Sequence, residues 1–184
     1  MGDIHTIIFY TLSFLSIYVQ VFFLVTFLEK RRHIIYSPPD LKLKDYPTVT
    51  VAVPCYNEEK DIDKTALSLL SLNYPQDKLS IFLVDDGSID NTYAKIKQFE
   101  KYLNVKVFHK ENGGKHTALN LALDNSTSEF FGCLDSDSFV HPEALKRIMR
   151  YFEEDKKTMA VAPAILVYNP KNILQTAQKV EYDM

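Results

Sequence analysis

The 184-residue chain has only two cysteines, and this scarcity excludes several kinds of site. Cys55 and Cys133 stand in different segments without Cys-x-x-Cys spacing, so neither a disulfide framework nor a zinc site is expected. Both lie in apolar, strand-like surroundings, which predicts reduced core residues in a cytosolic compartment. An excess of positive charge is also lacking. The net charge of −3 gives no basis for nucleic-acid binding.

The common glycine-rich and calcium-binding motifs are missing as well. The loop Gly113-Gly114-Lys115 lacks the earlier glycine of a Walker A motif, and His116 follows where that motif needs Ser or Thr. No Gly-x-Gly-x-x-Gly occurs. Phe139 and Val140 occupy the positions where an EF-hand starting at Asp135 needs Asp or Asn and then Gly. These three classes of site are therefore excluded.

Charged residues are absent between His5 and Glu29, and residues 7–28 are mostly apolar. At a rise of about 1.5 Å per residue, a helix of this length spans a hydrocarbon core of about 30 Å. We expect a transmembrane helix at 4–28 and a basic juxtamembrane linker at 29–46. The basic cluster 30–33 predicts that the chain crosses the plasma membrane once and that the following domain lies on the cytoplasmic side. It also argues against a signal peptide, whose positive charge precedes the apolar run.

From Pro47 onward, short β-branched runs alternate with helical spacings of apolar residues. Strands are expected at 48–53, 79–84, 105–108, in the stretch from Glu129, and at 159–163. Pro54 is expected to end the first strand, and Pro142 to begin a helix. This alternation predicts an α/β fold with a mostly parallel sheet and flanking helices. A helix that begins at 173–184 has nothing to pack against, so the domain is expected to be incomplete at its C-terminal end.

Carboxylates, an aromatic ring and a lysine are expected at one edge of this sheet. Tyr56 follows the first strand, Asp86 the second, and the pair Asp135 and Asp137 the fourth. Parallel strands present their carboxyl ends to the same edge, which is where ligands bind in open α/β sheets. Lys115 opens a helix after the third strand and is expected on the same side.

That mixture of side chains suits a nucleoside diphosphate. Tyr56 can stack on a base, and Asp86 can accept a hydrogen bond from a base N–H. Lys115 can neutralise phosphate charge as a point cation. Asp137 can hold Mg²⁺ or Mn²⁺, which binds through one or two carboxylates together with substrate phosphates.

Taken singly, each residue also has a purely structural explanation. Tyr56 fits a core aromatic at a strand end, and Asp86 fits a turn, where Asp and Gly are favoured. Lys115 fits a solvated lysine of a flexible loop, and 135–137 fits a polar turn before a helix. Only their joint placement favours a binding site. Three histidines without metal-ligand spacing are interpreted as structural or solvated: His109, His116 and His141.

Four motifs resemble, in order, those of the inverting family 2 glycosyltransferases of the GT-A fold. They are VPCYNE at 53–58, VDDGSIDNT at 84–92, GKHTALN at 114–120 and DSD at 135–137. The resemblance covers about 48–184 and implies that 47–184 is the nucleotide-sugar-binding half of a GT-A domain. With its preceding membrane helix, the chain is similar to the N-terminal part of the processive synthases for cellulose, hyaluronan, chitin and poly-N-acetylglucosamine.

The resemblance implies a metal-assisted transfer of sugar from a UDP-sugar to a glycan or lipid-linked acceptor, with inversion at the anomeric carbon. Mg²⁺ or Mn²⁺ stabilises the leaving diphosphate. It also implies a role for each matching residue. Pro54, Tyr56 and Glu58 lie around the nucleoside, Asp86 binds the uracil edge, Lys115 lies near the diphosphate, Asp135 approaches the ribose or phosphate, and Asp137 ligates the metal.

Two features of the family are missing from the chain. No Thr-Glu-Asp-like motif supplies a general base, and no Gln-x-x-Arg-Trp motif occurs, because the chain has no tryptophan. We therefore assign no catalytic residue and expect the base beyond Met184. The chain is expected to bind the donor but to transfer sugar poorly unless another chain, such as another membrane subunit, supplies the rest.

Two alternatives remain open. In one, the chain is a non-catalytic, membrane-anchored nucleotide-sugar-binding partner that docks onto another glycosyltransferase subunit through the exposed apolar surface of an unfinished sheet. In the other, it is a nucleotidyltransferase, an enzyme class that also binds its metal ion through carboxylates. The second lacks the Gly-rich, Arg-containing loop expected near the first strand.

Overall fold

The computed structural model describes residues 2–35, 43–163, 172 and 174–175. The chain divides into two units, one made of 1–40 with 164–184 and one made of 41–163. Helix α1 (Gly2–Ile35) belongs to the first unit. Its segment Ile4–Thr26, with a mean hydropathy of 2.0, is long and apolar enough to cross a membrane. The helix continues through the basic cluster, so residues 29–35 of the predicted linker are helical.

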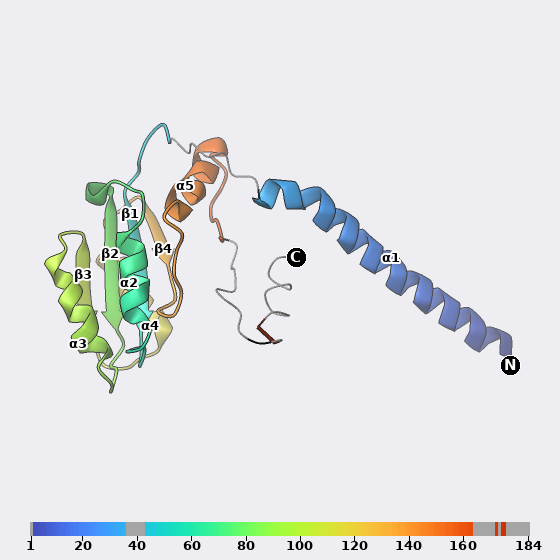
Figure 1. The fold of residues 1–184 in the computed structure, drawn as a ribbon, viewed down its shortest axis with the longest axis horizontal. Helices are drawn as coiled ribbons and strands as arrows, with labels where there is room; N and C mark the ends of the chain where they lie inside the picture. Colours follow the sequence, from blue (N-terminus) through green and yellow to red (C-terminus); the bar gives the residue numbers. More distant parts are fainter. Residues whose placement is uncertain (1, 36–42, 164–171, 173, 176–184) are drawn as a thin grey trace. The chain divides into compact units, whose positions relative to one another are not determined.

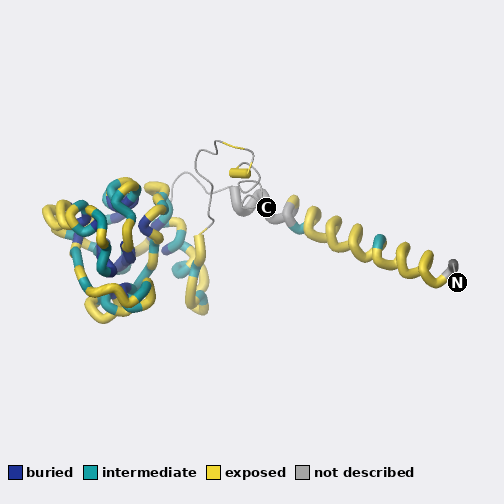
Figure 2. Tube along the Cα trace, turned by 90° about the horizontal axis from the view of Figure 1, so that it is seen from below, coloured by how far each residue is buried: buried dark blue, intermediate teal, exposed yellow. Residues whose placement is uncertain are grey.

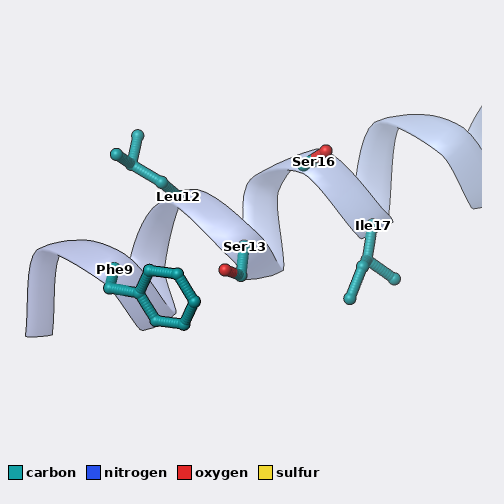
Figure 3. A pocket seen from close by; sticks show the side chains of 5 residues that line it. All are labelled: Phe9, Leu12, Ser13, Ser16 and Ile17. Carbon is teal, nitrogen blue, oxygen red and sulfur yellow. The ribbon is translucent and has the colours of Figure 1, made fainter. Parts of the chain in front are cut away.

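Helix α1 carries polar side chains within its apolar run. Gln20 Nε2 lies 3.4 Å from Ser16 Oγ and donates a hydrogen bond to it, one turn away. Ser16 also lies at a shallow hollow on the helix surface. Figure 3 shows the side chains that line it: Phe9, Leu12, Ser13, Ser16 and Ile17. This hollow contains none of the residues predicted for the binding site.

The second unit is built on a four-stranded sheet in the order β3-β2-β1-β4 (Figure 1). All three strand pairs are parallel, which confirms the predicted parallel sheet. The strands are β1 (Val49–Cys55), β2 (Leu79–Asp85), β3 (Val105–His109) and β4 (Phe130–Cys133). Their carboxyl ends therefore share one edge, which we call the rim.

Helices cover both faces of the sheet. Helices α2 (Ile62–Leu70), α3 (Thr92–Lys97) and α5 (Ala144–Glu154) pack on the face that carries Val51, Val53 and Leu83. Helix α4 (Lys115–Asp124) packs on the opposite face, against Ala52 and Phe82. Successive residues of a strand point to opposite faces of the sheet. The almost continuously apolar strands β1 and β2 therefore pack against helices on both faces. Figure 2 shows the buried positions inside this unit, whereas the described side chains of α1 are almost all exposed.

Short 3-10 turns complete the unit, η1 (Gln76–Lys78) and η2 (Gln98–Lys101). The domain begins within the predicted linker. Leu43 is buried in the core, and the backbone N–H groups of Lys44 and Asp45 donate to Glu153 Oε1 at 2.9 Å and 3.2 Å. Residues 43–46 are thus fastened to α5. Residues 36–42 of the predicted linker lie outside the described part.

The prediction that Pro54 ends the first strand is wrong, because β1 continues through Pro54 to Cys55. Hydrogen bonds of β1 alternate between its two neighbours: Ala52 O accepts from Leu134 N on the β4 side, and Cys55 O accepts from Asp86 N on the β2 side. Pro54 faces the β4 side, where β4 has already ended at Cys133. Its missing N–H therefore leaves no ladder bond unmade.

Three further expectations are corrected. The predicted fifth strand at 159–163 forms no strand, and Met159 is 91% exposed. Its alanines have little β propensity, and Pro163 has no N–H to donate.

Cys133 is not a core residue but lies exposed at the end of β4, whereas Cys55 is buried as predicted. Helix α5 begins at Ala144, two residues after Pro142. The helix expected at 173–184 lies outside the described residues apart from helical Leu174 and Gln175.

Candidate functional site

The loops that follow β1 and β2 are tied together at the rim. Asn57 N–H donates to Ser88 Oγ at 3.0 Å, and Asn57 Oδ1 accepts from Ile89 N–H at 2.9 Å. One residue further on, Glu58 N–H donates to Thr92 Oγ1 at 2.8 Å. Side chains of the facing segment, which include the first residue of α3, therefore satisfy these backbone groups and hold the two loops together.

Tyr56 leaves β1 at this point with 48% of its surface exposed. Pro54 and Cys55 before it are buried, and burial raises the pKa of the Cys55 thiol to about 12, so Cys55 is no nucleophile at neutral pH. The exposure of Tyr56 is inconsistent with a core aromatic. A half-exposed tyrosine between a buried strand and a tied loop can offer its ring as a stacking surface.

Asp86 is 3% exposed and organises the loop that follows β3. Its Oδ1 accepts from Lys110 Nζ at 2.6 Å and from Gly113 N–H at 3.1 Å, and its Oδ2 accepts from Gly114 N–H at 2.8 Å. Burial acts to raise the pKa of Asp86, but the bond from Lys110 and those from the two backbone N–H groups outweigh it. The net pKa is below the ordinary carboxyl value.

Glycines allow these loops to approach each other closely. Gly87 has φ 72°, and a β-carbon there would lie 2.6 Å from the backbone nitrogen of Asn112. At Gly113 a β-carbon would lie 2.7 Å from Thr117 Oγ1. Gly114, with φ 90°, is the N-cap residue directly before helix α4. The Asp–Gly and Gly–Gly pairs thus form turns, and these turns bring the β2 and β3 loops into contact around Asp86.

Lys115 connects this assembly to the loop after β4. Its Nζ donates to Asp135 Oδ1, and this bond raises the pKa of Lys115. The two side chains are 57% and 58% exposed, so the ion pair is open to solvent and to a ligand. Between the two aspartates, Ser136 O accepts from Thr65 Oγ1 at 2.7 Å, which fastens the loop to α2.

Negative charge is incompletely balanced near Asp137. Burial raises the pKa of Glu58 first, and the carboxylates of Asp137, Asp61 and Asp90 raise it further. Asp137 itself is exposed. An exposed hard oxygen ligand in an acidic surrounding fits Mg²⁺ or Mn²⁺, and a bound divalent cation would relieve this repulsion. Within the described residues no group of three or more His, Cys, Asp or Glu side chains is placed to hold a metal, so phosphate and water oxygens would have to complete the coordination.

The predicted residues lie around one rim. Asp86 holds the N–H of Gly114, next to Lys115, and Lys115 pairs with Asp135. The charge of Asp137 acts on both Lys115 and Glu58. Pro54, within β1, and Tyr56, directly after the strand, are different, because the contacts of the described residues include no hydrogen bond from either side chain to these charged residues.

Several contributing residues were not identified from the sequence. Lys110, the partner of Asp86, follows β3 directly, and the pairing of Asp85 with His109 places it beside Asp86. Sequence alone did not provide that register. His109 is structural in part: its Nδ1 lies 2.7 Å from Oδ2 of the fully buried Asp85, and its side chain is half-exposed.

Comparison with known proteins identifies the family. Residues 50–181 match the family model described as glycosyl transferase family 2. The poly-beta-1,6-N-acetyl-D-glucosamine synthase of Staphylococcus aureus strain COL is 30% identical over 179 residues, covering 93% of this chain and 42% of the relative. The enzyme of the same name from Staphylococcus epidermidis is 33% identical, covering 73% of this chain and 32% of the relative. The chain thus spans about two fifths of the length of the first of these relatives.

Solved structures show the same architecture. Staphylococcus aureus TarS in complex with UDP-GlcNAc has 27% identity and a TM-score of 0.54, covering 66% of this chain and 41% of that one. A mannosyltransferase from Pyrobaculum calidifontis in complex with GDP-Man and Mn²⁺ has 28% identity and a TM-score of 0.57, covering 70% and 39%. The parallel sheet with its flanking helices is the GT-A fold, and the chain belongs to glycosyl transferase family 2.

Proposed function

We propose that this chain is the donor-binding part of a membrane-anchored glycosyltransferase, with 47–184 as the nucleotide-sugar-binding half of the domain. It would transfer a sugar from a UDP-sugar to a glycan or lipid-linked acceptor with inversion. The observation that carries the proposal is the continuous set of contacts from Asp86 through Gly114 and Lys115 to Asp135. This set joins a predicted base-binding residue to predicted diphosphate-binding residues along one rim.

In this proposal, the nucleoside lies over the loops that follow β1 and β2. Tyr56 stacks on the base, with Pro54 and Glu58 beside it. Oδ1 of Asp86 is already used by Lys110 and Gly113, whereas Oδ2 accepts a single bond in the described network. Oδ2 therefore retains a lone pair for one base N–H, as the predicted contact to the uracil edge requires.

The diphosphate then lies near Lys115, Asp135 and Asp137. Lys115 exchanges part of its interaction with Asp135 for phosphate oxygens, and Asp135 is released toward the ribose or phosphate. Asp137 holds Mg²⁺ or Mn²⁺, which would neutralise charge on the leaving diphosphate when bound. The related mannosyltransferase was solved in complex with both GDP-Man and Mn²⁺, which supports this choice of ion.

We assign no general base to the residues of this chain. In the proposal, the proton of the acceptor hydroxyl goes to a group beyond Met184 or on another membrane subunit. The segment 4–28 anchors the domain to the plasma membrane, and the basic residues that follow place the domain in the cytoplasm. The length and hydropathy of Ile4–Thr26 support this anchoring.

Calorimetric titration of UDP into the full chain in detergent, with Mn²⁺, tests the proposal. We expect saturable binding, and Asp137→Ala should weaken the Mn²⁺-dependent part by about 100-fold, the upper end of the loss caused by removing a residue that only supports a metal ligand. Asp77→Ala is the matched control, because Asp77 is also exposed but lies at the amino end of β2, away from the rim. Absence of UDP binding, or equal binding by the unsubstituted chain and Asp137→Ala, would contradict the proposal.

A second candidate function is supported by the edge of the sheet. Within the described residues, β4 pairs only with β1, and Cys133 on β4 is exposed. An unpaired edge is a docking site for another chain, so the domain would serve as a non-catalytic nucleotide-sugar-binding partner. Light scattering of the detergent-solubilised chain together with related synthase subunits distinguishes the two. A strictly monomeric chain that never associates would argue against this second function.

A further inference from the structure

Asn57 has an unusual backbone conformation directly beside Tyr56. Its φ is 56°, and within the described residues no other non-glycine residue has a positive φ. This left-handed region is unfavourable for residues with a β-carbon, and Asn is one of the few that adopt it readily. Strand β1 is extended up to Cys55. The chain therefore changes direction within two residues, and the ring of Tyr56 lies at the turn.

The turn is held from the neighbouring loop by two opposed hydrogen bonds. Asn57 N–H donates to Ser88 Oγ, and Ile89 N–H donates to Asn57 Oδ1. Both of these partners follow β2, and the buried Asp85 at the end of β2 also accepts from Ser88 N–H at 3.3 Å. A displacement of the Tyr56 loop would break both bonds at once.

We infer that Asn57 is a positioning residue for Tyr56. Its left-handed turn and its two bonds to the β2 loop hold the half-exposed ring in the orientation that receives the base of the donor. The part of this inference that concerns the base rests on the proposed function, whereas the part that concerns the order of the ring does not. Asparagine supplies both a tolerated φ and a side-chain acceptor. Glycine supplies only the first, and alanine supplies neither.

The order of the ring can be measured without any nucleotide. The chain contains no tryptophan, so Tyr56→Trp introduces a single tryptophan at the ring position, and its fluorescence can be excited selectively over that of the tyrosines. In this background, Asn57→Ala should lower the fluorescence anisotropy and increase acrylamide quenching, and Asn57→Gly should do so less. Glu59→Ala is the matched control, because it removes a cross-loop bond to Asn91 N–H that is further from the ring. Unchanged anisotropy and quenching in Asn57→Ala would overturn the inference.

Titration with UDP and Mn²⁺ then tests the consequence for binding. Asn57→Ala should weaken UDP binding by about tenfold, because the left-handed turn becomes that much less populated and affinity falls with the competent fraction. Asn57→Gly should recover part of this loss. In a Tyr56→Ala background the loss should vanish, because Asn57 acts through the ring. An equal loss in both backgrounds would overturn the inference. Failure of the unsubstituted chain to bind UDP would instead defeat the proposed function, and the tryptophan measurement would still decide the role of Asn57.

Discussion

The two halves of the rim differ in how completely the protein builds them. On the β2 side, Asp86 is 3% exposed and holds Lys110, Gly113 and Gly114. On the β4 side, Asp135 is 58% exposed and is paired only to the equally exposed Lys115 in the described network. On the β2 side, the protein itself supplies the hydrogen-bond partners of the central carboxylate. The β4 side instead presents carboxylates and a lysine to solvent. This difference is expected if the base of the nucleotide binds to the preorganised β2 side. The metal ion and the diphosphate would then supply the missing partners of the exposed charges on the β4 side.

Removal of the central carboxylate should give the largest effect on stability. Asp86→Ala removes the acceptor of two backbone N–H groups and leaves the ammonium of Lys110 with only the Glu111 carbonyl among its described partners, and we expect a loss of about 3 kcal/mol in the free energy of unfolding. Urea denaturation followed by circular dichroism measures this loss. The same substitution at Asp135 should cost under about 0.5 kcal/mol, because that pair is exposed. Comparable losses at both positions would remove the contrast between the two halves.

Acid should remove the contribution of Asp86 to stability. The pKa of Asp86 is lower in the folded chain than its ordinary value, so its contribution to stability is complete above the ordinary carboxyl pKa. This contribution is lost as the pH falls through the lowered value. Thermal unfolding between neutral and strongly acidic pH should therefore show a fall in stability that is smaller in Asp86→Asn. Parallel pH profiles for the two proteins would contradict the assignment.

The hydroxyl of Thr65 should have an intermediate effect. Thr65 Oγ1 is buried and donates to Ser136 O, between the two aspartates of the β4 loop. Thr65→Val keeps the shape but loses this bond, so we expect a cost of about 1 kcal/mol and weaker Mn²⁺-dependent UDP binding. Ser71→Ala serves as the control, since the Ser71 hydroxyl is exposed and, among the described residues, donates to Ser68 O within the same helix end. Unaltered UDP binding in Thr65→Val would show that the β4 loop needs no support from α2.

Substitution of Lys115 should have the smallest effect on stability but a clear effect on the affinity for UDP. Lys115→Ala breaks an exposed ion pair, so the free energy of unfolding should change by less than about 0.5 kcal/mol. UDP binding should nevertheless weaken about tenfold, because a charge-assisted phosphate contact is lost. Lys115→Arg keeps the positive charge and should retain most of the affinity. A large stability loss without any change in UDP binding would reverse the proposed division between the two halves.

Much of this architecture could be predicted from local patterns. Strands β1 to β4 occur where β-branched and apolar runs occur, and the alternation with helices correctly indicates a parallel sheet. The errors arise where a pattern depends on a neighbour. A proline usually ends a strand inside a sheet, but the missing N–H of Pro54 faces the side on which β4 has already ended. The run 159–163 is apolar enough for a strand but forms none.

The amino-acid order by itself determined which residues stand at the carboxyl ends of the strands, because parallel strands joined by helices must place those ends together. It determined the apolar helix at 4–28 in the same way, through length and composition. Only the tertiary structure decided which partners these side chains take. Asp86 is held by Lys110 and a glycine loop, and Asn57 is fixed by Ser88 and Ile89. Such contacts depend on strand register and loop approach, which are set by packing between segments 24 to 32 residues apart and not by any local pattern.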